Sequence, residues 1–360
     1  MKPLSIKQIT FTNFKNYTNK SFRLGDRFNL VYGLNGAGKT NLLDGIYYLA
    51  VGKSYFTGSD LKVVKYGEPF FRLEGKVSRG ETFHDLVIKV KPGEVKDIQV
   101  DNDSVEKISD HIGFIPVVIS APRDIDLVAG HSQSRRRYFD HLLCQIDPAY
   151  LQSLVTYNHL LNLRTAALKQ SFKDLKRIVE TFDEQMAPHA NFIFSKRHWL
   201  KEVIQPFMQE NYKILSDDRE DAGIEYDSKL NQYPYEVLAD MSWEADRNTQ
   251  RSNIGIQKDD FHLSIKGMPA KEYGSQGQIK SLIFALHLSK HKILSQQCSF
   301  KPLLILDDIF DKLDEYRLAR LMEILQEPQF GQIFLSDTNR KRVTDFISSE
   351  MLNEVPMGIE

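Results

Sequence analysis

The chain has 360 residues, enough for two domains, and its 41% hydrophobic and 26% charged residues exclude extensive disorder. With 47 basic and 48 acidic side chains the net charge is −1, which excludes a protein that coats DNA through bulk charge but permits a local basic patch. Two widely separated cysteines indicate no disulfide framework or zinc ribbon. Without a signal-peptide pattern or an apolar run of about 18 residues, we expect a soluble cytoplasmic protein.

The first third of the chain has the pattern of an α/β domain. Residues 28–32 form a short apolar run that predicts a buried strand, and apolar residues at helical spacing predict a helix over 41–50. Alternating segments between about 70 and 100, and a buried strand over 117–120, add a β-rich part.

A phosphate-binding loop lies between the first buried strand and its helix. Residues Gly33–Thr40 read GLNGAGKT and fit the pattern G-x-x-x-x-G-K-[ST]. Its glycines allow the backbone N–H groups to surround phosphate oxygens, and the helix N-terminus adds partial positive charge. Lys39 is predicted to reach the β- and γ-phosphates of ATP and Thr40 to bind Mg²⁺. The predicted nucleotide-binding residues are Gly33, Leu34, Asn35, Gly36, Ala37, Gly38, Lys39, Thr40 and Asn41.

Residues 122–249 have a different pattern, with long helical periodicity and few glycines up to about 215, and predict a mostly helical lobe inserted into the α/β domain. Lys169, Lys173 and Lys176 are expected on one side of a helix whose other side is an apolar stripe. They are candidate contacts to DNA phosphates, although a merely solvated charged face explains them as well. Arg135 and Arg136 lie in a denser cluster of basic residues and are also candidate DNA contacts. The alternative is that they brace the inserted lobe against the α/β domain.

A second phosphate-directed segment precedes a long apolar helix. Ser275, Gln276, Gly277 and Gln278 lie about thirty residues before the acidic strand described next, as the signature does in ATPases of the ABC type. A hydroxyl, glycine N–H groups and a helix N-terminus all favour an anion. In such ATPases this segment binds the γ-phosphate held by a second subunit.

An apolar strand over 303–306 ends in two carboxylates, Asp307 and Asp308. Asp307 is predicted to bind Mg²⁺ beside the phosphate loop, because Mg²⁺ prefers hard carboxylate ligands. Asp308 is predicted to orient or deprotonate the attacking water. If the strand continues, alternation sends the two side chains in opposite directions and allows these separate roles.

Taken together, these segments resemble the RecF family, bacterial recombinational-repair ATPases of the ABC/SMC-head class, over essentially the whole chain. Asn13–Tyr17 resembles the family's NFRNY with Lys15 in place of Arg, and Gly255–Asp260 resembles GPHRDD with Gln257 in place of His. Further similar segments are Gly33–Ile46, Gly52–Phe56, 122–140 and Leu306–Leu321. Asp337 lies where transporter subunits of the ABC class have a switch His.

The resemblance implies an ABC-type P-loop ATPase head, residues 1–121 and 250–360, with the helical lobe inserted at 122–249. It implies a slow DNA-dependent ATPase that dimerises around two ATP molecules, with Mg²⁺, on double-stranded or junction DNA. Its implied partners are RecO, RecR and the RecA recombinase at single-strand gaps. Two alternatives remain: an ATPase coupled to a transporter, and an ATP-sensing DNA binder that does not hydrolyse ATP.

Overall fold

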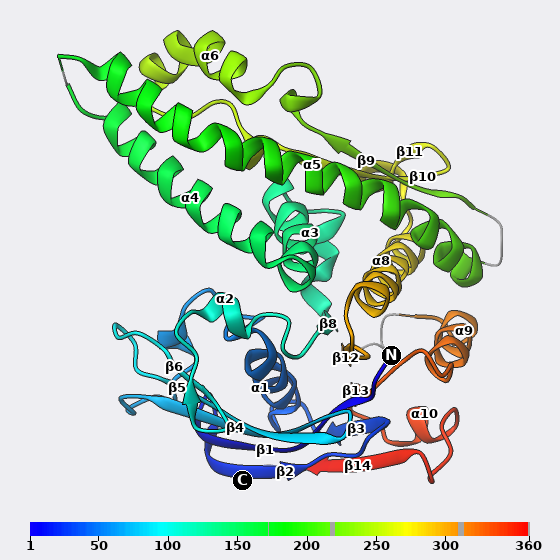
Figure 1. Ribbon diagram of the computed structural model, residues 1–360. Coiled ribbons are helices and arrows are strands. Elements are labelled where there is room, and N and C mark those ends of the chain that lie inside the picture. Colours follow the sequence, from blue (N-terminus) through cyan, green and yellow to red (C-terminus); the bar gives the residue numbers. More distant parts are fainter. Residues whose placement is uncertain (172, 217–219, 309–312, 359–360) are drawn as a thin grey trace. The chain divides into compact units, whose positions relative to one another are not determined.

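The computed structural model describes residues 1–171, 173–216, 220–308 and 313–358 (Figure 1). They divide into two compact units. The head unit comprises Met1–Asp124, Asn211–Arg219 and Gln276–Glu360, and the lobe unit comprises Ile125–Glu210 and Glu220–Ser275. The expected mixed α/β head with a helical insertion is confirmed, and within the described residues no helix is long and apolar enough to span a membrane.

The head unit contains two sheets. One is antiparallel, with strand order β2-β1-β4-β5-β6-β7, and the other is parallel, with order β14-β3-β13-β12-β8. The antiparallel strands are β1 (Leu4–Phe14), β2 (Tyr17–Arg23), β4 (Phe71–Arg79), β5 (Thr82–Val90), β6 (Asp97–Val100) and β7 (Asp103–Ser104). The parallel strands are β3 (Phe28–Gly33), β8 (Val117–Ser120), β12 (Leu303–Leu306), β13 (Ile333–Asp337) and β14 (Leu352–Met357).

Helix α1 (Lys39–Val51) lies between the two sheets and contacts β1 and β4 of one and β3, β8 and β13 of the other (Figure 1). A helix covered on both sides is expected to be mostly apolar, and every residue from Leu42 to Val51 is buried, including Asp44, which pairs with Lys15. Gly45 permits the close approach to β1, because a Cβ there would lie 2.1 Å from the Phe11 ring. The remaining head helices are α2 (Ile108–His111), α8 (Gln276–Gln297), α9 (Glu315–Leu325) and α10 (Lys341–Thr344).

The first segment of the head unit ends at Asp124, whose carboxylate is buried and accepts hydrogen bonds from several donors. It accepts hydrogen bonds from His287 Nε2 at 3.0 Å and from the backbone N–H of Ala121 at 2.8 Å, and another from the Tyr55 hydroxyl. Burial alone would raise the pKa of Asp124, but these hydrogen bonds outweigh it and lower the pKa. The neighbouring Arg123 stacks over the Tyr55 ring at 4.1 Å.

The lobe unit is mostly helical but includes a small sheet of order β11-β10-β9. Its elements are α3 (Ser132–Ile146), α4 (Pro148–Leu168), α5 (Leu175–Ser216), β9 (Ala222–Asp227), α6 (Tyr235–Thr249), β10 (Asp260–Ile265), β11 (Met268–Pro269) and α7 (Ala270–Tyr273); the unit boundary falls within α5. The expected end of the lobe at 249 differs from this division. Residues 250–275 stay in the lobe unit because β10 pairs with β9 along its whole length.

A buried arginine organises the lobe interior. Arg197 of α5 is 1% exposed and forms ion pairs with Asp140 of α3 at 2.9 Å and with Asp259 at 2.8 Å. It also donates to the carbonyl oxygen of Ile256 at 2.7 Å. Burial opposes its charge, but these carboxylates outweigh that effect and raise the pKa of the guanidinium. The segment 255–260 is therefore held to α3 and α5 from within the lobe unit.

This network predicts a strong effect of Arg197→Met on stability. The substitution keeps the aliphatic bulk but leaves the buried Asp259 and the half-buried Asp140 without this cation. Breaking a buried ion pair typically costs about 3–5 kcal/mol of unfolding free energy. The control is Lys201→Ala, one turn along α5, whose ion pair with Glu202 is largely exposed; such pairs contribute about 0–1 kcal/mol. Urea unfolding of both variants is the measurement. Equal, small losses would show that the Arg197 network does not stabilise the lobe.

Candidate functional site: a phosphate loop beside two carboxylates

The loop between β3 and α1 is built on glycines in conformations that other residues rarely adopt. Gly36 and Gly38 have φ of 83° and 98°, and a Cβ at Gly33 would lie 2.3 Å from the Met357 carbonyl oxygen. Lys39 Nζ folds over the loop and donates to the carbonyl oxygens of Gly33 at 2.8 Å and Leu34 at 3.2 Å. The predicted residues Gly33–Asn41 thus form one continuous loop and first helical turn.

The end of β1 and the start of β2 brace this loop from the antiparallel sheet. The Tyr17 hydroxyl donates to the Gly38 carbonyl oxygen at 2.8 Å, and Asn41 Nδ2 donates to Asn16 Oδ1 at 2.7 Å. A Cβ at Gly38 would lie 2.9 Å from Asn16 Nδ2 and 2.9 Å from the Tyr17 hydroxyl, and its φ of 98° also favours glycine. The adjacent Lys15 forms an ion pair with the buried Asp44 of α1 at 2.6 Å. Sequence reasoning noted this N-terminal segment only as a resemblance and missed its contact with the loop.

The acidic strand ends beside the phosphate loop. In the parallel sheet β13 lies between β3 and β12, so the carboxyl ends of all three strands meet at one edge. Asp307, which follows β12 directly, is buried, and Thr40 Oγ1 lies 3.1 Å from its Oδ2. Ligands of open α/β sheets bind at such an edge. The structure therefore places Thr40, which follows Lys39 in α1, beside Asp307; their roles toward ATP and Mg²⁺ stay predictions.

Asp308 is separated from Asp307 by a backbone turn. Its φ is 54°, in the left-handed region, and β12 has already ended at Leu306. The Asp307 and Asp308 side chains are therefore separated by this local turn and not by strand alternation. Ser336 of β13 holds both residues: its hydroxyl donates to Asp307 Oδ1 at 2.6 Å and accepts from the Asp308 backbone N–H at 2.9 Å. Ser336 was not predicted, although its place at the end of an apolar strand was a usable signal.

The donors at this edge have the chemistry that Mg²⁺ requires. Thr40 Oγ1 and the Asp307 carboxylate are hard oxygen donors that already face each other across 3.1 Å. A bound Mg²⁺ would neutralise phosphate charge. Its protein ligands would be these two side chains, beside a loop shaped for phosphate.

The signature segment begins helix α8. Gln276 is the first residue of α8, directly after Ser275, which closes the lobe unit. In the head unit Gly277 packs against Arg317 of α9, since a Cβ at Gly277 would lie 2.7 Å from Arg317 Nη1. Arg317 is in turn held by Asp314, the N-cap of α9, at 2.6 Å. A side chain at this position would therefore have to displace the Arg317 guanidinium.

The arginines proposed as DNA contacts already have partners inside the lobe unit, a carboxylate for Arg135 and a hydroxyl and a backbone carbonyl oxygen for Arg136. Arg135 forms a two-pronged pair with Asp260, with Nε–Oδ1 and Nη2–Oδ2 distances of 2.7 and 2.8 Å. Burial would raise the pKa of Asp260, but the hydrogen bond from Arg135 outweighs it and lowers the pKa. Arg136 donates to the Asp259 carbonyl oxygen at 2.6 Å and to Ser132 Oγ at 2.7 Å. Both arginines therefore brace α3 against the segment before β10.

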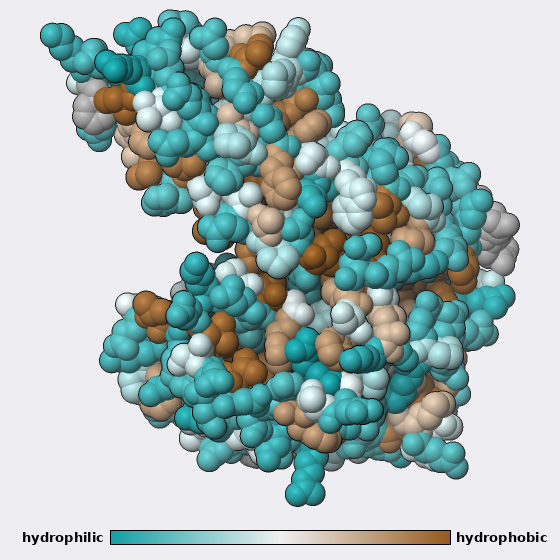
Figure 2. Space-filling view, in the orientation of Figure 1, coloured by the Kyte–Doolittle hydropathy of each residue, from teal (hydrophilic) through white to brown (hydrophobic). Residues whose placement is uncertain are grey.

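The predicted lysines lie at the end of the helical arm formed by α4 and α5, not on one side of a single helix. α4 ends at Leu168 and α5 begins at Leu175, so Lys169 and Lys173 lie in the connection between them; the expected stripe residue Phe172 lies outside the described residues. Lys169, Lys173 and Lys176 are all exposed. Hydrophilic side chains predominate at this end in Figure 2. Lys176 has one exposed neighbour of opposite charge, Glu180, at 3.7 Å.

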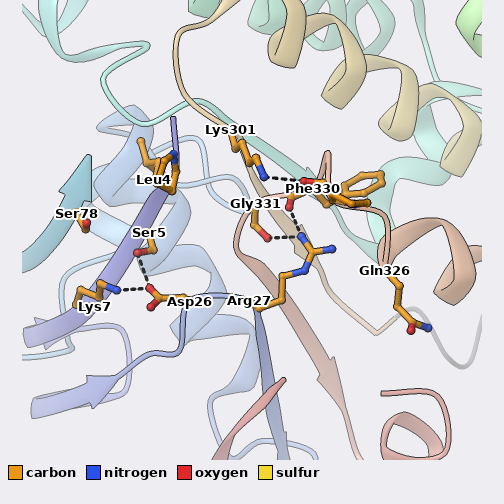
Figure 3. Close-up of a pocket in the computed structure, with 12 residues that line it drawn as sticks. Leu4, Ser5, Lys7, Asp26, Arg27, Ser78, Lys301, Gln326, Phe330 and Gly331 are labelled. Carbon is orange, nitrogen blue, oxygen red and sulfur yellow. Dashed lines mark hydrogen bonds and ion pairs between the residues drawn. The ribbon is translucent and has the colours of Figure 1, made fainter. Parts of the chain in front are cut away.

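A pocket of about 480 Å³ lies at the other end of β3, away from the phosphate loop (Figure 3). Arg27 points across it and donates to the carbonyl oxygens of Leu325, Glu327, Phe330 and Gly331, while Lys301 donates to that of Pro328. These cations neutralise the carboxyl end of α9 and the turn after it. The pocket is thus a structural junction, and the phosphate-loop edge remains the candidate functional site.

Comparison with known proteins identifies the family of the chain. An AAA domain family model matches residues 8–342. The DNA replication and repair protein RecF of Flavobacterium johnsoniae is 34% identical over 351 residues, covering 96% of this chain and 97% of that protein. The RecF of Cytophaga hutchinsonii is 36% identical over 348 residues, covering 96% and 92%.

Solved structures extend the similarity. A structure of the recombination mediator protein RecF with ATP, in the RecFOR pathway, superimposes with a TM-score of 0.86 at 27% identity, covering 95% of this chain and 94% of that one. The Smc head domain from Pyrococcus furiosus shares the fold alone, with a TM-score of 0.53 at 14% identity over 93% of this chain and 90% of that one. The chain therefore belongs to the RecF family of DNA replication and repair proteins.

Proposed function

We propose that this chain is an ATP-dependent DNA-binding protein of recombinational repair and replication restart, in which ATP and Mg²⁺ binding drives dimerisation on DNA. The observation that carries the proposal is the convergence of Lys39, Thr40 and Asp307 at one sheet edge, with Asp308 beside them. The similarity to a structure of RecF with ATP supports nucleotide binding by this chain. The chain would act in the cytoplasm with RecO and RecR to load RecA at single-strand gaps, partners that follow from the family.

The proposed mechanism assigns each residue a separate task. The loop N–H groups and Lys39 hold the β- and γ-phosphates, and Thr40 and Asp307 hold Mg²⁺. Asp308 orients or deprotonates the attacking water. Ser275 and Gly277 of a second copy complete the site, so ATP lies between the two copies. Hydrolysis, which is slow and stimulated by DNA, removes this shared ATP and ends the dimeric state. A transporter-coupled ATPase is not favoured, because such subunits have a Gln at the crossing into the inserted lobe and a switch His. This chain has Ser120 and Ala121 at the crossing and Asp337 at the position of the His.

The nucleotide assignment predicts the effect of Lys39→Ala. Removing the ammonium from the β- and γ-phosphates should weaken ATP binding by roughly tenfold or more and abolish hydrolysis. Equilibrium binding of a fluorescent ATP analogue is the measurement, with Lys62→Ala as the control because Lys62 is an exposed lysine of the same unit. Parental affinity and turnover in Lys39→Ala would show that nucleotide binds elsewhere.

The division of labour between the carboxylates predicts that Asp308→Asn binds ATP but hydrolyses it roughly 10²–10⁴-fold more slowly. Asparagine tolerates the left-handed backbone at this position, so the substitution changes basicity rather than conformation. ATP-bound dimer should therefore accumulate, as measured by light scattering with ATP and Mg²⁺. A monomeric Asp308→Asn chain with ATP bound would contradict the dimeric mechanism.

The dimer also predicts that Ser275→Arg binds ATP as a monomer, because a bulky side chain would block the shared site. Gln297→Arg adds the same bulk and charge at an exposed position at the other end of α8 and should dimerise normally. The same light-scattering experiment compares the two variants. Normal dimerisation of Ser275→Arg would exclude the shared site but leave the phosphate-loop assignment intact.

The end of the helical arm is proposed to contact DNA phosphates. Alanine at Lys169, Lys173 and Lys176 should weaken binding similarly for all sequences and flatten the plot of log affinity against log salt by up to about 0.9 per lost phosphate contact. The control removes three exposed head lysines, Lys76, Lys89 and Lys107, and so matches the change in net charge. An unchanged slope in the first variant assigns the arm lysines to solvent. Arg135 and Arg136 are then weak substitutes because both already bind acidic partners or backbone within the lobe unit.

A further inference from the structure

Ser336, at the end of β13, is the one side chain whose described hydrogen bonds join it to both acidic residues of the candidate site. Its neighbours follow from the register, because Leu335 of β13 pairs with Leu306 of β12 and the next residues along the two strands are Ser336 and Asp307. Ser336 is fully buried, and Asp307 is only 2% exposed. The contact therefore lies inside the sheet edge, where water cannot replace a lost partner.

A serine hydroxyl has a single proton to donate, and here that proton is committed to Asp307. Ser336 Oγ donates to Asp307 Oδ1 at 2.6 Å. Thr40 Oγ1 lies 3.1 Å from the other oxygen of the same carboxylate, Oδ2, and 3.4 Å from Oδ1. Ser336 thus restrains the rotation of the Asp307 carboxylate, because it holds Oδ1 and leaves Oδ2 as the oxygen nearer to Thr40.

The same hydroxyl fixes the backbone of the next residue. The Asp308 N–H donates to Ser336 Oγ at 2.9 Å, and Asp308 has a φ of 54°, a conformation that is unfavourable for a residue with a side chain. This hydrogen bond supports the turn that separates the Asp308 side chain from that of Asp307. Two carboxylates adjacent in sequence are therefore given different environments by one oxygen atom on a neighbouring strand.

We propose that Ser336 is a positioning residue that presents Asp307 to Mg²⁺ and holds the turn at Asp308. The inference rests on the proposed ATPase function and deepens it. A serine with a purely structural role would affect ATP binding equally with and without Mg²⁺. A serine that positions Asp307 affects specifically the part of ATP affinity that depends on Mg²⁺. The reason is that no described hydrogen bond joins Ser336 itself to the phosphate loop or to Lys39.

The test measures ATP affinity of Ser336→Ala in Mg²⁺ and in EDTA, using the full chain and a fluorescent ATP analogue. We expect affinity in EDTA close to that of the unsubstituted chain, and a loss of roughly tenfold or more in the gain that Mg²⁺ provides, as for a hydrogen bond to a charged group. The Mg²⁺ concentration for half-maximal hydrolysis should rise in parallel. If Ser336→Ala does not fold, Ser336→Cys keeps the size, donates more weakly and carries the same test.

Ser5→Ala is the matched control. Ser5 also donates a hydroxyl hydrogen bond to an aspartate, Asp26, at 2.8 Å, but at the opposite end of β3 from the phosphate loop. Its Mg²⁺-dependent gain should equal that of the unsubstituted chain. An unchanged gain in Ser336→Ala, or equal losses in Mg²⁺ and EDTA, would overturn the positioning role and leave the proposed function standing. Absence of ATP binding by the unsubstituted chain would overturn both.

Discussion

The site depends on the order of three parallel strands. Because β13 lies between β3 and β12, the phosphate loop that follows β3 and the carboxylates that follow β12 are one strand apart at the same sheet edge. The intervening strand is close enough to contribute through its last residues, and Ser336 does so by bonding Asp307 and Asp308. No long side chain has to reach across the sheet, and short Thr, Ser and Asp side chains suffice.

The loop itself is held from the second sheet. Helix α1 is buried between both sheets, and the Tyr17 hydroxyl and Asn16 reach the loop and the first turn of that helix. The Lys15–Asp44 ion pair joins the same N-terminal segment to the middle of α1. The loop and the first turns of α1 are thus supported by side chains of the second sheet.

In the lobe unit, Arg135 of α3 and Arg197 of α5 form ion pairs within the unit. Arg197 and Arg135 bind carboxylates of the segment before β10, and the large desolvation cost of such charges is offset only when each has a close partner. This separates two kinds of basic residue that the sequence alone cannot distinguish: those that hold the lobe together, and the exposed lysines at the end of the arm, which remain candidates for a polyanionic partner.

The sequence predicted those parts of the fold and site that are encoded by neighbouring residues. The phosphate loop, α1, β3 and β8 are of this kind, because glycine positions and apolar periodicity are local signals. The structure differs from the expected lobe end at 249 because β10 pairs with β9, and from the expected single helix through the arm lysines because α4 ends before them. Neither feature is visible in a local sequence pattern. The roles of Ser336 and Arg135 depend on partners distant in sequence, and the predicted trans arrangement of Ser275 depends on a second copy.

The most direct test of the central claim is a crystal structure of the full chain with Mg²⁺ and a non-hydrolysable ATP analogue. The account predicts phosphates enclosed by Gly33–Thr40 and Mg²⁺ held by Thr40 and Asp307, with Ser336 still bonded to the same carboxylate. Phosphates outside the loop, or Mg²⁺ bound without Asp307, would contradict it.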